Sequence, residues 1–479
     1  MRDHSSRAAA AGRWRAGLFI AAMGAVAAGG FVSPQPLAYM LVVIPVLLPA
    51  AIWWRGGQQG IPILPVISAI YFLYYGAPLL GGDLGFYDSS EVVAAAGTVG
   101  VFLVVASLAC WPFQRVRGRS TVSAQALISD RNITRVVFAG LIAGILFQLL
   151  VSADAFGWLG TFFGVVRQVA LTLSAVACYL LGYARAAGLL TGRQWTQALA
   201  ALIVLVLLSI SGLFLVGGLM EMLAAFLGYI VAAKRIPWAT LATVFALVVV
   251  LHSGKGTIRQ RYWVYQSNSM AGSYVTQIPE IMSEWAEDGT VALLTGDTGQ
   301  SILQRASLLN MVLFVERSTP DAAPYLDGET YALLPQMLVP RFLAPDKLAS
   351  QAAMELLNIH YGIESAEEAR VTAIGWGLIA EAYANFGIWG VIGIGAFFGV
   401  LCGFFVRLSI GVPPVSTPMF VSIAAMMALL NVEQDFSYLM VTLAQTVIAV
   451  LIAGVLLGVS KARTAALDAE HTMIAPYEP

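Results

Sequence analysis

The feature that most constrains this chain is a succession of apolar runs, each long enough to cross a lipid bilayer as a helix. A crossing helix needs about 20 residues, and the hydrocarbon core accepts a backbone only when its polar groups are bonded internally. Hydrophobic residues make up 59% of the chain and charged residues 11%, against about 25% charged residues in soluble proteins. We therefore predict an all-α polytopic membrane protein of about twelve spans, at residues 17–33, 36–54, 61–80, 92–112, 136–152, 165–184, 196–211, 214–233, 237–252, 376–406, 417–433 and 438–460.

Several other readings are less favourable. The first thirty residues have the basic, apolar and small-residue order of a signal peptide, but a second apolar run follows almost at once, so we interpret them as an uncleaved first span. Cys110, Cys178 and Cys402 lie within apolar runs and are expected to pack rather than form disulfides. The four histidines are scattered, so no metal site and no cofactor is expected. A net charge of −1 gives no reason to expect a nucleic-acid partner.

The positions of lysine and arginine predict the topology. If the N-terminus is inside, most of the 26 basic residues fall in inside segments, and the short outside loops hold none apart from Arg167 at a helix edge. This divides the chain into residues 1–252 with spans one to nine, a large extracytoplasmic loop at 253–370, and residues 371–479 with the last three spans and a cytoplasmic tail. Both termini are then cytoplasmic.

The loop at 253–370 is expected to be a small folded unit at the outer mouth of the bundle, because it carries helical patterns of its own. Residues 297–318 and 346–361 read as amphipathic helices. Ser365 and Glu368 have the spacing of a capping box ahead of the next helix.

Basic residues in this loop predict an anion site. Three of them follow the ninth span in HSGKGTIRQRYW, where Arg259 and Arg261 would share a face on an extended strand. Arg341 and Lys347 lie in LVPRFLAPDK, whose prolines stiffen the backbone. Rigid cations beside a bilayer suit a phosphate, although such residues also pair with nearby acids or touch lipid phosphates. The predicted diphosphate-binding set is Lys255, Arg259, Arg261, Arg305, Arg341 and Lys347.

Two carboxylates and a group of aromatic residues complete the candidates. Glu221 lies within a span and Glu381 lies where the loop re-enters the membrane. Burying a carboxylate there costs free energy, so each is a functional candidate. The alternative for Glu221 is a structural partner of a neighbouring helix, and the alternative for Glu381 is a solvated side chain at the membrane interface. Tyr262 and Trp263 follow the ninth span, where aromatic rings either stack on sugars or form an interfacial belt.

The order of these segments resembles a known family. A basic GKG-TIRQRYW exit is followed by ERSTP, then by YLDGETYALLPQMLVPRFLAPDK, and finally by EAYANFGIWGVIG. This order is similar to that of Wzy-type oligosaccharide repeat-unit polymerases of bacterial surface polysaccharide pathways, over roughly the last 230 residues. The chain departs from the family in lacking a proline after Lys347 and an arginine after the Ser-Gly turn of SISGLFLVGGLMEM. The matching residues are Gly328, Thr330, Tyr331, Pro340, Arg341, Leu343, Pro345, Lys347, Glu381, Tyr383, Asn385, Phe386, Gly387 and Gly390.

The resemblance implies a GT-C-like, metal-independent glycosyltransferase in the bacterial inner membrane. Its substrate would be an undecaprenyl-diphosphate-linked oligosaccharide outside the membrane, with membrane lipids and a chain-length regulator as further partners. An acceptor hydroxyl needs a general base, for which Glu381, His360 and Glu329 are the candidates, in that order. The candidate glycan-binding residues are Tyr262, Trp263, Tyr331 and Tyr383.

Two other functions stay open. O-antigen ligases share the architecture but place a histidine ahead of the closing glycine segment, where this chain has Glu381. A flippase or other transporter for lipid-linked glycans would carry charged residues in several spans and only short loops, whereas this chain has one long loop.

The topology can be tested with reporter fusions. We expect a fusion at Gly289 to report the outside and a fusion at Pro479 to report the cytoplasm, because the basic residues place the two on opposite sides. Paired alkaline phosphatase and fluorescent-protein reporters measure this directly. If both positions report the same compartment, the twelve-span arrangement is wrong.

Overall fold

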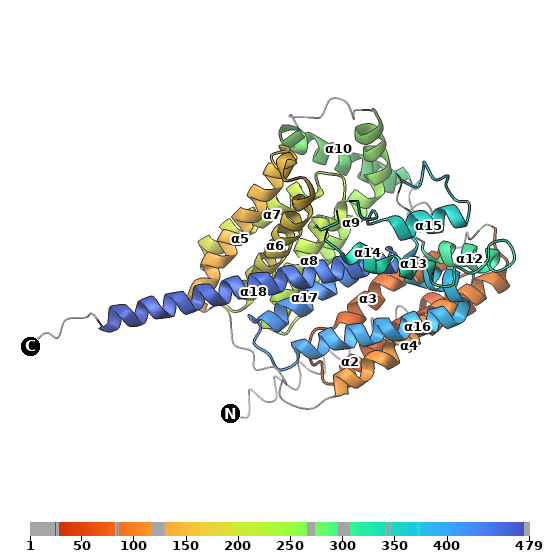
Figure 1. Cartoon of the computed structure of the whole chain (residues 1–479), viewed down its shortest axis with the longest axis horizontal. Coiled ribbons are helices and arrows are strands. Elements are labelled where there is room, and N and C mark those ends of the chain that lie inside the picture. The colour runs from red at the N-terminus through yellow and green to blue at the C-terminus, as the bar shows by residue number, and fades with distance from the viewer. Residues whose placement is uncertain are drawn as a thin grey trace, which may run out of the picture.

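Figure 1 shows the computed structural model of the chain, in which the regular elements of the described part are all helices. The structure describes residues 24, 28–81, 84, 86–115, 128, 130–265, 274–295, 307–340, 343–344, 346–370, 372 and 374–473. Within these ranges, 10 helices are long and apolar enough to cross a membrane. They are α2 (Pro36–Arg55), α3 with its continuation (Ile63–Leu80), α4 (Ser89–Arg115), α5 (Asp130–Ser152), α6 (Phe163–Ala186), α7 (Gly192–Ile210), α8 (Leu215–Ala233), α9 (Trp238–Arg259), α16 (Gly377–Ser409) and α18 (Phe436–Met473).

These helices confirm a multi-pass membrane protein, but not the count of twelve spans. The expected span at 17–33 falls largely outside the described residues. The expected span at 417–433 is a helix of 13 residues, α17 (Thr417–Leu429), which at 1.5 Å per residue is roughly 20 Å long and shorter than the ~30 Å hydrocarbon core. Near 211–214 the chain makes a tight hairpin rather than a kinked helix, with Leu213 at φ 63°.

The helices form two groups with α17 and α18 between them (Figure 1). One group is α2, α3, α4 and α16, and the other is α5 to α8. Glycines set the closest crossings: a Cβ on Gly228 of α8 would overlap the carbonyl oxygen of Tyr179, and one on Gly182 of α6 would overlap that of Ala225. Small residues let helix backbones approach closely in a membrane, where packing rather than the hydrophobic effect drives association.

The loop forms one long helix and several short helices at one end of the bundle. These are α10 (Tyr274–Thr295), α12 (Leu309–Ser318), α13 (Glu329–Ala332), α14 (Leu334–Leu338) and α15 (Ala352–His360). Of these, α12 packs on α4 and α16, whereas α13 and α14 pack on α18. Of the helix expected at 297–318, residues 297–306 lie outside the described residues and α12 covers the rest from Leu309, while α15 is a shorter version of the helix expected at 346–361. The capping box is present, since the amide of Ser365 donates to Glu368 Oε2 at 2.9 Å and that of Glu368 to Ser365 Oγ at 3.4 Å.

The expectation of an extended exit after the ninth span is wrong. Helix α9 continues without a break to Arg259 and then through a π-helical turn, Gln260–Tyr265. Gly254, Ile258 and Tyr262 recur at every fourth position and are all buried, and a Cβ on Gly254 would press on the backbone of α10. This buried stripe against α10 keeps the segment helical.

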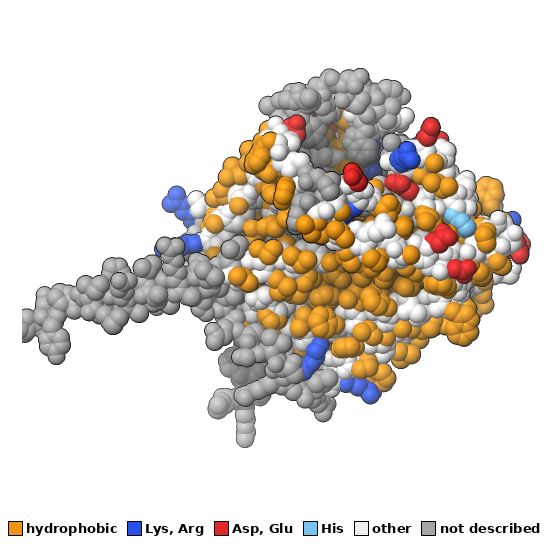
Figure 2. Space-filling model, viewed as in Figure 1, with side chains coloured by type: hydrophobic (Ala, Val, Ile, Leu, Met, Phe, Trp, Pro, Cys, Tyr) orange, Lys and Arg blue, Asp and Glu red, His pale blue; other side chains and the backbone are white. Residues whose placement is uncertain are grey.

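Figure 2 shows hydrophobic side chains forming a broad band across the described surface. On the face that it displays, acidic side chains gather at the end that carries the loop helices. An apolar band bounded by charged ends is the surface expected of a membrane-embedded bundle.

The α6–α8 crossing gives a test of the fold. Gly228→Ala places a methyl group against the Tyr179 carbonyl, so we expect it to lower the free energy of unfolding by roughly 1–3 kcal/mol. Gly393→Ala in α16 is the matched control, because nothing lies within 4 Å of its added Cβ. Thermal unfolding in detergent measures both, and equal unfolding temperatures for the two variants would contradict this packing.

Candidate functional site at the loop end of the bundle

Two segments of the loop motif meet directly in the structure. The amide of Gly328 donates a hydrogen bond to Asn385 Oδ1 at 3.0 Å, and Asn385 Nδ2 donates to Thr330 Oγ1 at 2.9 Å. Both Thr330 and Asn385 are fully buried. The Tyr331 ring stacks on Phe386 with centroids 6.2 Å apart. Residues 328–331 and 381–387, well separated in the chain, therefore form one buried contact.

A break in α16 makes this contact possible. Gly387 has φ 58° and Gly328 has φ 95°, in the left-handed region that side chains disfavour. The break lets the loop backbone add hydrogen bonds to α16, with the amide of Leu326 donating to Ala384 O at 3.1 Å and that of Asp327 to Asn385 O at 3.2 Å. The glycines thus allow the loop to dock onto the break.

Glu381 lies at the centre of this region and is fully buried. Its Oε2 accepts a hydrogen bond of 2.6 Å from the amide of Phe436, the first residue of α18. The buried Asp435 lies close enough for the two carboxylates to interact, and Glu381 Oε1 has no hydrogen-bond partner in the described part of the chain. A carboxylate at a helix N-terminus is favourable, so Glu381 acts first as the cap of α18.

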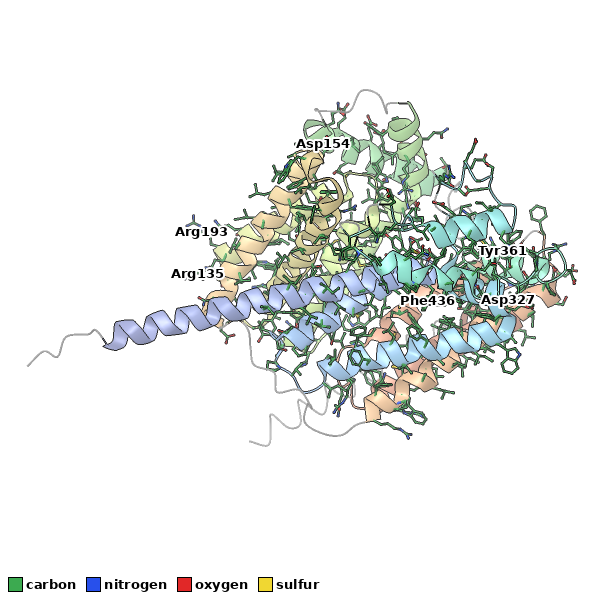
Figure 3. The ribbon with its side chains drawn as sticks, viewed as in Figure 1. Arg135, Asp154, Arg193, Asp327, Tyr361 and Phe436 are labelled. Carbon is green, nitrogen blue, oxygen red and sulfur yellow. The ribbon has the colours of Figure 1, made fainter. Side chains whose placement is uncertain are left out.

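Aromatic residues cover the cap. Tyr331 packs edge-on against Phe436 with centroids 5.2 Å apart, and Phe436 in turn contacts Phe397 at 5.4 Å. Burial raises the pKa of the Tyr331 phenol well above its ordinary value, and Glu381 adds to the shift. Figure 3 marks Phe436 at the start of α18, beside the loop helices. Tyr331, a candidate glycan residue, is thus mostly committed to packing.

A charged group lies beside this network, and sequence analysis missed its carboxylate. Glu433, in the turn between α17 and α18, is close enough to Lys255 and Arg259 for its charge to act on both. The hydroxyl of Tyr74 donates to Glu433 Oε2 at 3.4 Å. The rule that singles out Glu221 and Glu381, an acid among apolar segments, also applies to Glu433.

The expectation that Arg259 and Arg261 share a face is wrong. Because their segment is helical, the two side chains point in different directions and contact different partners. Arg259 donates from Nε and Nη2 to the carbonyl of Leu213, at 3.1 and 2.8 Å, in the turn between α7 and α8. Arg261 pairs with Glu284 at 2.6 Å and with Asp288 at 3.4 Å on α10. Arg261 therefore joins α9 to α10, whereas Arg259 reaches the Ser-Gly turn, which lacks an arginine of its own.

The other predicted cations and aromatic residues are less central. Lys347 Nζ donates to the carbonyls of Met337 and Val339, at 2.8 and 2.7 Å, and so ties its own loop together. Arg305 and Arg341 lie outside the described residues, as does the side chain of Trp263. Arg259 and Arg261 therefore do not converge as expected, whereas the contribution of Arg305 and Arg341 to an anion site stays a prediction. Tyr262 is buried between α9 and α10, with its hydroxyl on Glu284 at 3.2 Å.

The remaining candidate bases lie on the loop. His360 Nε2 is 2.9 Å from the carbonyl oxygen of Pro324, and its ring packs against Tyr361. Glu329 is exposed at the first residue of α13. Glu316 on α12 was not a candidate, yet burial raises its pKa to about 7, and it lies near Tyr383.

Glu221 fits the structural interpretation better. It is buried in α8, and its Oε1 accepts a 2.8 Å hydrogen bond from Ser209 on α7, which in turn accepts one from Gln148 on α5. This chain of hydrogen bonds ties three helices together. Among the described residues, no three His, Cys, Asp or Glu side chains lie close enough to share a metal ion.

Comparisons with protein-family models, with curated proteins and with solved structures found no match to this chain.

Stability measurements can test the role of Glu381 as a cap. We expect Glu381→Ala to lower the free energy of unfolding by roughly 1–3 kcal/mol, because the Phe436 amide is left buried without an acceptor. Glu381→Gln keeps an acceptor oxygen and should cost clearly less. Thermal unfolding followed by tryptophan fluorescence compares the two variants, and equal losses would show that this hydrogen bond is not what Glu381 contributes.

Proposed function

We propose that this protein is a polysaccharide polymerase, which joins undecaprenyl-diphosphate-linked oligosaccharide repeat units at the outer face of the bacterial cytoplasmic membrane. One observation carries the proposal. The segments that resemble the polymerase family, residues 328–331 and 381–387, are hydrogen-bonded to each other and lie beside the turn that holds Glu433, next to the basic end of α9.

The charges at this end suit a lipid-diphosphate donor. When the glycosidic bond to the diphosphate breaks, negative charge develops on the leaving phosphate oxygen, and fixed cations in a partly dry site stabilise it. Lys255 and Arg259 lie four residues apart on one helix, whose Gly254 and Ile258 are buried beside them, so little reorganisation is needed to receive that charge. Arg259 is further oriented by its two hydrogen bonds to Leu213.

A long loop over the bundle is also more consistent with an enzyme that binds two lipid-linked oligosaccharides than with a transporter. The helices α12 to α15 cover α4, α16 and α18 at one end, and the buried carboxylates Glu221 and Glu381 both take part in hydrogen bonds between helices. A ligase would share this arrangement and differs in its acceptor, so the test must identify the product.

Purified protein in lipid nanodiscs, given undecaprenyl-diphosphate-linked oligosaccharide, should release undecaprenyl diphosphate and form a ladder of repeat-unit multimers. We expect Lys255→Met to lower the initial rate by roughly tenfold or more, because one charge-assisted contact to the diphosphate is lost. Gel separation of the glycans with quantitation of the released lipid measures both.

Lys234→Met is the matched control, since Lys234 is an exposed residue at the C-terminus of α8 and lies outside the site. A product extended by a single unit on an unrelated acceptor would indicate a ligase. Movement of the lipid-linked glycan across the bilayer, without any new glycosidic bond, would indicate a transporter.

A further inference from the structure

Glu433 lies in a turn whose backbone is hydrogen-bonded to the segment that joins the loop to α16. The amide of Gly377 donates to the carbonyl of Glu433 at 3.1 Å. A Cβ built on Gly375 would lie 3.3 Å from the Cβ of Glu433, closer than a side chain is normally tolerated. The returning loop thus fits closely around Glu433 and fixes where its side chain starts.

The two oxygens of the Glu433 carboxylate differ: one accepts a hydrogen bond from a described residue of the protein and the other does not. Tyr74 donates to Oε2, while no hydrogen bond to Oε1 occurs within the described part of the chain. The residue is partly exposed, and Oε1 is not among the buried unsatisfied oxygens, in contrast to that of Glu381. An accessible carboxylate oxygen with no partner is available to a hydroxyl group.

Glu433 also lies within electrostatic range of the cations Lys255 and Arg259. Among the described residues, it is the acid whose charge acts on both Lys255 and Arg259. The charges of Lys255 and Glu433 act on each other, although the two side chains do not form an ion pair. In a glycosyl transfer the attacked carbon is bonded directly to the diphosphate, so the base must lie within hydrogen-bond reach of a hydroxyl placed next to the diphosphate cations.

The other carboxylates and His360 meet this requirement less well. Glu381 is fully buried and its Oε2 is occupied by the Phe436 amide. His360 lies against Pro324 on the loop, and Glu329 is exposed at the start of α13. No interaction joins the side chain of Glu381, His360 or Glu329 to Lys255 or Arg259 in the described part of the chain.

We propose that Glu433 is the general base of the transfer, an inference that rests on the proposed function. The acceptor hydroxyl oxygen forms the new bond to the anomeric carbon, and its proton passes to Glu433 Oε1. The bond from that carbon to the diphosphate breaks, and its electron pair leaves with undecaprenyl diphosphate beside Lys255 and Arg259. Tyr74 orients the carboxylate, and Glu381 is a positioning residue that holds the turn.

The test compares carboxylate variants in the nanodisc polymerisation assay. Glu433→Gln keeps the shape and an acceptor for Tyr74 but cannot take a proton, so we expect kcat to fall roughly 10²–10⁴-fold. The KM for the lipid-linked donor should change little, because the cations remain. Glu433→Asp, which retains a carboxylate on a shorter side chain, should recover part of kcat.

Glu280→Gln on the exposed face of α10 is the matched control, and unfolding temperatures in the same nanodiscs show that each variant is folded. If the wild-type protein polymerises and Glu433→Gln stays within about threefold of it, the base assignment is overturned while the proposed function stands. A changed KM with unchanged kcat, or a larger kcat loss in folded Glu381→Gln than in Glu433→Gln, overturns it equally. A wild-type protein that forms no multimers overturns the proposed function, and the assignment with it.

Discussion

The hydrogen bond from the Phe436 amide to Glu381 is the interaction on which the loop end depends. Helix α17 has only 13 residues, and in the turn that follows it Val432 and Asp435 are buried while Glu433 is partly exposed. Irregular backbone among buried residues is stable only where protein groups bond it. A carboxylate from α16 does so for the first amide of α18, and the amide of Gly377 does so for the carbonyl of Glu433.

The loop contacts the residues that follow this turn. Ser437 donates to the carbonyl of Thr330 at 3.1 Å, and Tyr331 packs between Phe386 and Phe436. Because α17 is short, helices α13 and α14 can pack on the beginning of α18. The loop is therefore part of the bundle's core at this end, and its motif residues hold the turn that carries Glu433 in place.

Helix α9 places Lys255 and Arg259 within electrostatic range of Glu433 in the same turn. Its continuation to Arg259 and into the following π-helical turn packs on α10 through Gly254, Ile258 and Tyr262, which keeps the basic segment helical. The hydrogen bonds of Arg259 to Leu213 also connect this segment to the α7–α8 turn. Cations fixed before a ligand arrives stabilise developing charge without further reorganisation, which is what leaving-group stabilisation requires.

The sequence by itself determined the class of protein, because apolar runs of bilayer length and scarce charge leave few alternatives. It also predicted a long loop after the ninth span and predicted that Glu381 matters, since a carboxylate among apolar residues needs a partner. Only the tertiary structure decided that Arg259 and Arg261 diverge, because buried contacts with α10 kept their segment helical. It also decided that Glu381 caps α18 while Glu433 lies within electrostatic range of Lys255 and Arg259. Both outcomes depend on contacts between helices far apart in the chain, and local sequence patterns do not specify which helices become neighbours.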